Sequence, residues 1–402
     1  MRTIEKYLIA FYFLICPIEI ALHLVVTSTA KYAGLMILLT EGCILLSRRK
    51  NMDVNFSFGS AATLFWIAYS AITVIWANTN SLTFEYLTTY AMMGALLFAC
   101  TMETWNEAEI DLFVRAYLIG SILMAFTVIF FGGGGFSDRE TIIIMGSECD
   151  PNQVAANIVP GAMLSFDRFF GEKTNRKTKI ISLASFVLCT YSIFQTGSRG
   201  GFAALALGVA YLLFVAFRRG AVKIWMILLA VVVGAVSVSY IPVFTEGRVL
   251  DFGSYNATYS NQLNRVIIWQ KLLSTFDEQW IWGHGVGSTV NYLERAIGKV
   301  TAVHNTFLHV LFEVGFAGFS LFIFPYVTMI RRYYKKNGAL VSVLLGAMAC
   351  SFFLDALNLR YLWNGLMLCI MQYHLDIYGQ EQEAQLRSQS GPRPVCKYIR
   401  DY

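Results

Sequence analysis

Long apolar runs alternate with short polar segments along most of the chain. A helix needs roughly 20 mostly apolar residues to cross about 30 Å of hydrocarbon, and the runs predict twelve such helices. Lipid offers the backbone no hydrogen-bonding partners, so these runs must be helical. The pattern therefore predicts an all-α, polytopic integral membrane protein with about 12 transmembrane helices. The predicted spans are approximately 7–26, 32–47, 59–76, 84–101, 112–132, 152–170, 179–195, 200–217, 222–242, 304–330, 339–356 and 360–378.

Three of these spans carry weaker signals than the others. The second and seventh are short, and Pro160-Gly161 interrupts the sixth. Residues 1–26 combine a charged start with an apolar run but lack a small-residue cleavage site, so we interpret them as a retained first span rather than a signal peptide.

Composition agrees with this class. Hydrophobic residues make up 56% of the 402 residues and charged residues only 14%, whereas soluble proteins have about a quarter of their residues charged. A net charge of +5 is too small to indicate a nucleic-acid partner. The eight cysteines are scattered without zinc or disulfide spacing.

The distribution of lysine and arginine predicts the orientation of the chain in the membrane. With a cytoplasmic N-terminus, the cytoplasmic segments collect 21 basic residues and the external segments nine. This bias places both termini inside, because basic residues are retained on the cytoplasmic side. The organisation predicted is one membrane domain (1–379) with a large external loop at 243–303. A polar tail at 380–402, with prolines at 392 and 394, is expected to be cytoplasmic and disordered.

Arg199 lies in a tight turn, QTGSRGG, between two predicted spans on the external side. Gly197 and Gly200 allow the backbone to approach a ligand closely. Exposed amides at the start of the following helix favour an anion, and arginine adds a planar donor fork suited to phosphate. The alternative is an ordinary turn, with Ser198 in it, whose arginine meets a lipid headgroup.

Arg265 begins a predicted amphipathic helix at 264–276, where apolar residues recur at spacings of three and four. Such a helix suits a membrane surface or the roof of a cavity. Arg265 and Trp269 would share one face. The alternative is a surface helix whose arginine snorkels to the headgroups.

His304 follows the external loop and opens a span, where an imidazole can take a proton from a hydrated acceptor. Asn305 is its neighbour, and Glu313 lies further along the same predicted helix, where an intramembrane carboxylate is a candidate functional residue. His309 falls about 140° around that helix from His304 and is interpreted as a packing residue, as is His284 in its loop.

Asp150 and Asn152 precede the sixth span, with Pro151 at the first helical position, so they either cap a helix or help position a substrate. Arg360, near the outer end of the last span, is a candidate third external cation. Glu19, Glu41 and Asp355 are isolated acidic residues in or near the spans, and they are the candidates for a transport pathway.

The segment HNTFLHVLFEVGFAG at 304–318 pairs a histidine and asparagine with a later glycine-x-x-glycine. This spacing resembles the signature of the O-antigen ligase and polymerase superfamily. The glycine-serine-arginine-glycine turn at 197–200 and the arginine-x-x-x-tryptophan before GHGVGS at 265–288 are also similar to that superfamily. Residue Phe319 stands where the family usually has threonine or valine.

The resemblance implies a core at about 180–330 and a C-type glycosyltransferase-like fold. It also implies roles: His304 as catalytic base, and Arg199 and Arg265, with Arg360 as a further candidate, as ligands of the donor diphosphate. The expected donor is a polyprenyl-diphosphate-linked oligosaccharide, and the expected site faces outside in a bacterial plasma (inner) membrane. We expect neither metal nor ATP, because the outward loops contain no ligand cluster and the chain has no phosphate-binding loop motif.

Two functions within this class stay open. A polymerase would transfer the chain to another lipid-linked repeat unit for a surface polysaccharide, and a ligase would transfer it to lipid A-core or protein. Partners would be the lipid-linked donor, a glycan or lipid-linked acceptor, membrane lipids and polysaccharide-assembly proteins. A transporter or flippase is the alternative of another class, since twelve spans with both ends inside are common there. Internal symmetry and paired intramembrane charges, which transporters usually carry, are missing from the pattern.

Overall fold

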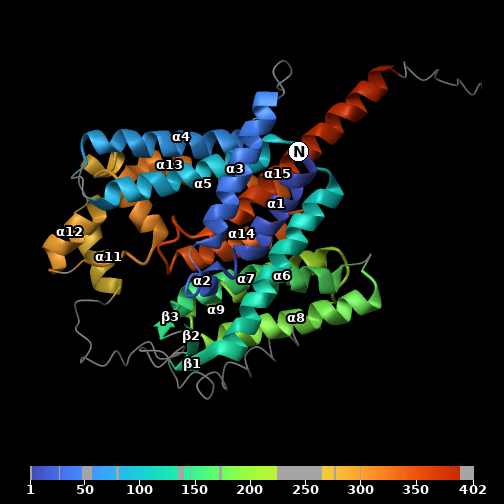
Figure 1. The fold of residues 1–402 in the computed structure, drawn as a ribbon, viewed down its shortest axis with the longest axis horizontal. Helices are drawn as coiled ribbons and strands as arrows, with labels where there is room; N and C mark the ends of the chain where they lie inside the picture. Colours follow the sequence, from blue (N-terminus) through green and yellow to red (C-terminus); the bar gives the residue numbers. More distant parts are fainter. Residues whose placement is uncertain are drawn as a thin grey trace, which may run out of the picture.

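The fold is a bundle of long helices in a computed structural model (Figure 1). Most helices run near the long axis of the molecule. Helices α11 and α12 lie at one end of it, and the C-terminal part of α15 lies at the other. The structure describes residues 2–26, 28–47, 57–77, 81–134, 140–144, 146–171, 174–223, 265–275, 278–298 and 300–389.

The helical elements are bounded as follows. They are α1 (Arg2–Ile15), α2 (Glu19–Leu22), α3 (Thr29–Ser47), α4 (Phe58–Ile72), α5 (Ser81–Met102), α6 (Glu107–Phe131), α7 (Pro151–Phe170), α8 (Arg176–Gln195), α9 (Arg199–Arg218), α11 (Arg265–Leu273), α12 (Ser288–Ile297), α13 (Thr306–Tyr333), α14 (Gly338–Ser351) and α15 (Arg360–Gln389), with short 3-10 turns at Thr73–Ile75 and Glu278–Ile281.

Six described helical segments are long and apolar enough to cross a membrane: Thr29–Ser47, Phe58–Ile75, Glu107–Phe131, Arg176–Gln195, Arg199–Arg218 and Thr306–Tyr333. The prediction of a mostly helical membrane protein is therefore confirmed, whereas the number twelve stays a prediction. The predicted spans coincide with helices except the ninth, at 222–242, which falls outside the described residues from 224 onward. Residues 243–264 of the predicted external loop are likewise outside them.

Proline acts differently in two of the predicted spans. The first span is not one continuous helix: α1 ends at Ile15, just before Pro17, and the short α2 follows. Pro160, by contrast, lies inside α7 without ending it. Proline removes one backbone donor and clashes with the preceding turn, so its effect depends on whether the neighbouring helices hold the segment in place. Residues around Pro160 are fully buried, and that packing maintains α7.

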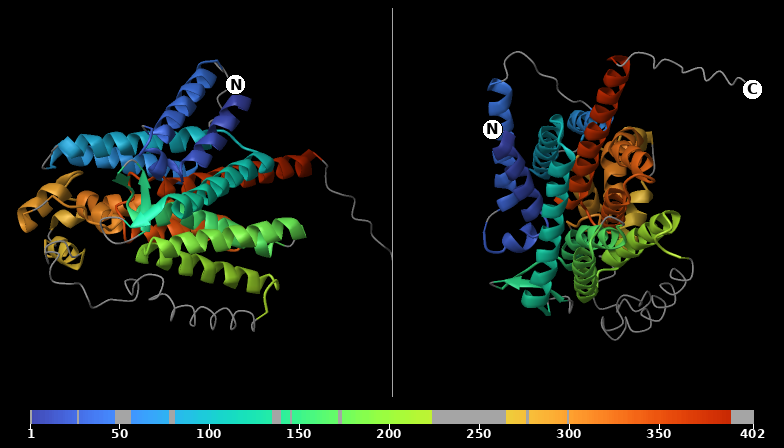
Figure 2. Two further views of the ribbon diagram at one scale, coloured as in Figure 1. Left: turned by 60° about the horizontal axis from the view of Figure 1, so that its bottom comes forward. Right: turned by 90° about the vertical axis from the view of Figure 1, so that its right-hand side faces the viewer.

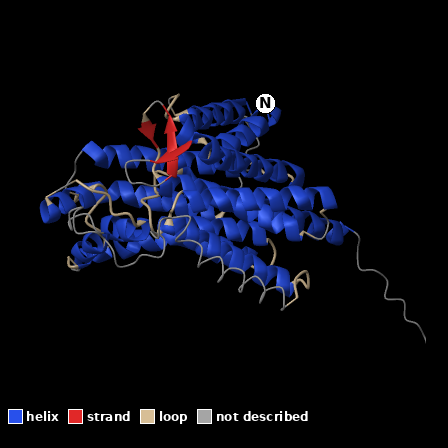
Figure 3. Ribbon diagram, turned by 90° about the horizontal axis from the view of Figure 1, so that it is seen from below, coloured by secondary structure: helices blue, strands red, loops and turns tan. Residues whose placement is uncertain are grey.

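A small antiparallel sheet departs from the all-α prediction (Figure 3). Its strands are β1 (Gly132–Gly134), β2 (Glu140–Ile144) and β3 (Ser147–Glu148), in the order β1-β2-β3. Gly134 pairs with Glu140 and Ile144 with Ser147, so two hairpins follow α6 directly. The glycine run at 132–135 disfavours continuation of the helix, because glycine loses the most backbone entropy on ordering. The sheet ends at the start of α7.

Helix α7 lies in the core and packs against α6, α8, α9 and α14. Glycines permit this close packing: a Cβ at Gly161 would lie 2.5 Å from the Cβ of Ser121, and one at Gly208 would lie 2.1 Å from Met163 Sδ. In the right-hand view of Figure 2 the blue N-terminal helices and the orange α11–α13 region lie on opposite sides of red α15. The helix α15 also continues to Gln389, into the tail predicted to be disordered.

The long helix α13 is broken at Gly315, whose φ of 65° and ψ of −173° are not helical. The break leaves the carbonyls of Phe312 and Glu313 without their usual partners in the next turn. These carbonyls instead accept hydrogen bonds from the backbone N–H groups of His284 and Gly285, at 2.9 and 2.8 Å. The segment 278–287 before α12, called the outer segment for its predicted external side, is thereby fastened to the middle of α13.

Candidate active site

Three segments that are far apart in sequence meet at the first turns of α7, α9 and α13. Ser198 Oγ donates a hydrogen bond to Asn152 Oδ1 at 3.0 Å, which joins the starts of α9 and α7. A Cβ on Gly200 would lie 2.9 Å from that of Phe353, so α9 also touches the loop after α14. Thr306 Oγ1 donates to the Leu354 carbonyl of the same loop at 2.6 Å. The structure thus brings the 150–152, 197–200 and 304–306 motifs into one region.

Asp150 and Asn152 act together at the start of α7. The Asp150 side chain accepts from the backbone N–H of Asn152 at 2.8 Å and from its side-chain amide at 3.1 Å. This is the cap that the sequence suggested as one alternative, with Pro151 at the first helical position. The same amide group then presents its oxygen to Ser198. The Asn152 side chain therefore takes part in the cap of α7 and also aligns the neighbouring 197–200 turn.

The 197–200 turn begins α9. Gly197 has a φ of 57°, in the left-handed region that glycine enters without strain. Ser198 caps the helix by accepting from the backbone N–H of Gly201 at 3.1 Å. Arg199 is the first helical residue and is exposed. The residue therefore begins the helix at its N-terminus, where backbone dipoles favour an anion.

Helix α11 holds Arg265 next to His304. The indole Nε1 of Trp269 donates to the Val303 carbonyl at 2.9 Å, and the Trp269 ring meets Phe352 edge-on at 5.7 Å. Arg265 lies at the start of this helix and is half-buried. The predicted amphipathic helix is therefore present, and it packs against the residue immediately before His304.

His304 has a backbone φ of 55° and is, among the described residues, the one non-glycine residue with a positive φ. Such a conformation persists where surrounding contacts hold it, and here the His304 N–H donates to Asp355 Oδ2 at 2.9 Å. Burial and the nearby positive charge of Arg265 lower the pKa of His304, while Asp355 and Asp150 oppose that shift. The lowered pKa favours the neutral form of the imidazole, which can accept a proton.

Asn305 is the cap of α13. Its side chain accepts from the backbone N–H of Leu308 at 3.0 Å, and the residue is buried. A helix N-cap explains why asparagine follows the histidine in this motif.

His309 was interpreted as a packing residue, but it lies between two carboxylates. Its Nδ1 is 3.0 Å from Asp355 Oδ1, and its Nε2 is 3.1 Å from Glu313 Oε1. The Glu313 carboxylate also accepts from Thr289 Oγ1 at 2.6 Å and from the Gly287 N–H at 2.9 Å. His284, in contrast, stacks on the ring of a phenylalanine of α13 at 4.2 Å, in agreement with a packing role.

Arg360 is engaged inside the protein. Its Nη1 lies 2.6 Å from Glu19 Oε2, and the Arg360 side chain is only 19% exposed. This ion pair connects the first turn of α15 to α2. Glu19 and Asp355 are therefore not the isolated acidic residues that the sequence suggested, because Glu19 pairs with Arg360 and Asp355 with His309.

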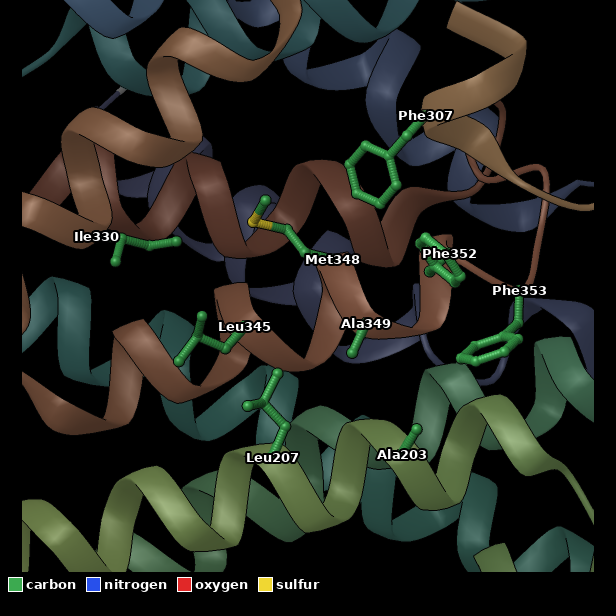
Figure 4. Close-up of a pocket in the computed structure, with 9 residues that line it drawn as sticks. All are labelled: Ala203, Leu207, Phe307, Ile330, Leu345, Met348, Ala349, Phe352 and Phe353. Carbon is green, nitrogen blue, oxygen red and sulfur yellow. The ribbon is translucent and has the colours of Figure 1, made fainter. Parts of the chain in front are cut away.

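An apolar groove of about 420 Å³ runs beside this region, between α9, α13 and α14 (Figure 4). Phe307 and Phe353 line its end nearest His304 and the 197–200 turn, and Ile330 lines it further along α13. The full lining is Ala203, Leu207, Phe307, Ile330, Leu345, Met348, Ala349, Phe352 and Phe353. The groove is apolar throughout, so it suits a hydrocarbon chain.

Residues 184–323 match the family model described as O-Antigen ligase. This segment is similar to the O-antigen ligases. The matched segment contains Arg199, Arg265 and His304, and the relationship agrees with the resemblance read from the motifs. Members of that family are O-antigen ligases, which are glycosyltransferase-type enzymes, and the match supports an O-antigen ligase or polymerase type of function in surface polysaccharide assembly. With the six apolar helices of the described residues, the match indicates a multi-pass membrane protein that carries a segment similar to O-antigen ligases.

No curated protein and no solved structure matches this chain. Within the described ranges, no group of three histidine, cysteine, aspartate or glutamate side chains is arranged to hold a metal ion. Independence of metal stays a prediction.

The contacts of His309 and Asp355 were missed in the sequence. The spacing of four between His309 and Glu313 was a usable signal, since residues four apart share one face of a helix. Asp355 carries no such signal, because it comes from a loop 46 residues further along the chain.

Proposed function

We propose that this protein is a membrane glycosyltransferase that extends a surface polysaccharide from a polyprenyl-diphosphate-linked oligosaccharide. The observation that carries the proposal is the position of a neutral, half-buried His304 within the electrostatic reach of Arg265, at the meeting point of three motifs. His304 would accept the proton of the acceptor hydroxyl as its oxygen attacks the anomeric carbon. The bond from that carbon to the diphosphate would break on the opposite face, which inverts the anomeric centre.

Arg199 and Arg265 are assigned to the diphosphate. Negative charge grows on the leaving group as the glycosidic bond breaks, and preorganised cations stabilise that charge. Arg199 stands beside a helix N-terminus and Arg265 beside the proposed base. Arg360 is assigned a structural role instead, because Glu19 already compensates its charge. With two arginines on the diphosphate, the proposed reaction needs no metal.

Four further residues of the site have supporting roles in this proposal. Asp150 and Asn152 would align the first turn of α9, and Gly197 and Gly200 would let the diphosphate approach its backbone. These are positioning roles, since the Asp150 side chain caps its own helix and the Asn152 side chain connects Asp150 to Ser198 of α9.

The isoprenoid chain of the donor is assigned to the apolar groove. The groove starts beside Gly200 and Phe307, next to the residues assigned to the diphosphate. A lipid anchored there would present its head group to Arg199 and His304 while its tail stays in an apolar environment.

A polymerase is favoured over a ligase, because such enzymes serve cells with or without an outer membrane. A transporter is the alternative of another class. Its candidate carboxylates were Glu19, Glu41 and Asp355, and two of them form ion pairs within the protein. Paired charges of this kind hold elements together and leave no obvious pathway for a transported ion.

The proposed orientation has the site outside and both termini in the cytoplasm. In a cysteine-free background, single cysteines at Ser254 and Gln385 should react oppositely with an impermeant thiol reagent in intact cells or spheroplasts. Equal labelling of both would contradict the orientation.

The decisive experiment incubates purified protein with lipid-linked repeat units and resolves the products by size. A ladder of products indicates a polymerase, and a single transfer to lipid A-core or protein indicates a ligase. His304→Ala should still bind the donor but slow transfer by about 10²–10⁴-fold, the usual contribution of a general base. An unchanged rate in His304→Ala would remove the proposed mechanism.

A further inference from the structure

His309 is the centre of a buried charged network that the proposed chemistry does not use. The residue is 6% exposed. Its Nδ1 shares a hydrogen bond with Asp355 Oδ1 at 3.0 Å, and its Nε2 lies at an ion-pair distance of 3.1 Å from Glu313 Oε1. A neutral imidazole has only one N–H to donate. Both nitrogens can donate to carboxylates only when the ring is doubly protonated and positively charged. The third neighbour is the Tyr86 ring of α5, edge-on at 6.0 Å.

The two carboxylates extend the network in opposite directions. Asp355 uses its second oxygen, Oδ2, to accept the backbone N–H of His304 at 2.9 Å. Glu313 accepts from the Gly287 N–H and from Thr289 Oγ1, at the start of α12. One buried imidazole therefore connects the backbone of His304 to the outer segment that carries α12.

We propose that His309, Asp355 and Glu313 are positioning residues that together hold the His304 backbone in its left-handed conformation and so direct its imidazole. This inference rests on the proposed function, in which His304 is the base. The support is geometric: the strained φ of 55° is held by a hydrogen bond to Asp355, and Asp355 is itself fixed by His309. A charged acceptor makes that hydrogen bond strong, and the imidazolium keeps the acceptor charged.

The network should affect turnover rather than donor binding, because none of its three members is assigned to the diphosphate. Asp355→Asn and His309→Gln should lower kcat by about 10²-fold, the cost of displacing a reacting group by roughly 1 Å, with little change in KM for the donor. His23→Gln is the matched control, since His23 is exposed and its Nδ1 accepts from the backbone N–H of Ser28, which is not part of the network. A change confined to KM would contradict a positioning role.

A measurement independent of activity tests the network directly. The chain has five histidines, so ¹⁵N-histidine NMR spectra of the full-length protein in lipid contain few signals. We expect one doubly protonated imidazole that persists at about pH 8 and is lost in His309→Gln. The His304 signal, assigned by its loss in His304→Ala, should shift in His309→Gln and in Asp355→Asn but not in His23→Gln.

The transfer assay tests the proposed function, and the NMR measurement tests the positioning role separately. If the wild-type protein transfers no sugar, the proposed function falls, whereas the NMR shifts still decide whether the network positions His304. If the His304 signal is the same in wild type, His309→Gln and Asp355→Asn, the positioning role is overturned even when transfer is observed. Absence of a doubly protonated histidine at about pH 8 overturns it as well.

Discussion

Replacement of Gly315 by alanine should detach the outer segment from α13. A Cβ at Gly315 would lie 2.4 Å from the backbone nitrogen of Gly283 and 2.6 Å from the Ile281 carbonyl oxygen. These neighbours are backbone atoms, so no side-chain rotation relieves the overlap. The conformation of Gly315, with φ of 65° and ψ of −173°, is moreover one that essentially only glycine adopts.

The size of the effect on the detached population follows from the strain that alanine adds to the attached state. Strain of this kind costs about 1–3 kcal/mol. Moving the segment away breaks two backbone hydrogen bonds, from His284 and Gly285, each contributing about 0.5–1.5 kcal/mol. Detachment breaks these bonds in the wild type and the variant alike, so the strain of about 1–3 kcal/mol alone sets the change, and it increases the population of the detached segment at least about 5-fold, since 1.36 kcal/mol is a factor of ten.

Limited trypsin digestion of the purified protein measures this population. Cleavage at Arg295 in α12 should be at least about 5-fold faster in Gly315→Ala, while cleavage at Lys177 in α8 should not change. Gly42→Ala is the matched control, because a Cβ there meets no atom within 4 Å and alanine favours a helix interior. Equal digestion of Gly315→Ala and wild type at Arg295 would refute the reasoning about the break in α13.

Three further outcomes are expected in the transfer assay. Arg199→Lys and Arg265→Lys should each lose about 10- to 150-fold, because a point charge cannot replace a bidentate contact contributing about 1.5–3 kcal/mol. The pKa of His304 is lowered by burial and by Arg265, so transfer should persist below pH 6.5, and Arg265→Gln should move the acidic limb of the kcat profile to higher pH. Ala349→Trp, which fills the groove, should raise KM for a long-chain lipid donor more than for a short-chain one. Phe214→Trp, on the exposed surface of α9, should change neither the KM for the long-chain donor nor that for the short-chain donor.

The sequence alone determined the class of the protein and most of its helices. Apolar runs of this length have no stable arrangement in lipid except a helix, so periodicity was sufficient to predict them. It also determined the candidate side chains, because the motifs around Arg199, Arg265 and His304 are local. The roles of Ser198, Asn305 and Asp150 as helix caps follow from the same local logic of unsatisfied backbone amides.

Only the tertiary structure decided which of these side chains meet. The bond between Ser198 and Asn152 joins residues 46 apart, and the one between Asp355 and His304 joins residues 51 apart. No period of a helix or strand relates such positions. The same limit explains why the role of His309 was missed. Its spacing on α13 shows which face of the helix it occupies, but not that Asp355 lies against that face. Helical periodicity determines direction within one element, whereas contacts between elements depend on how side chains from the whole chain fill the interior together.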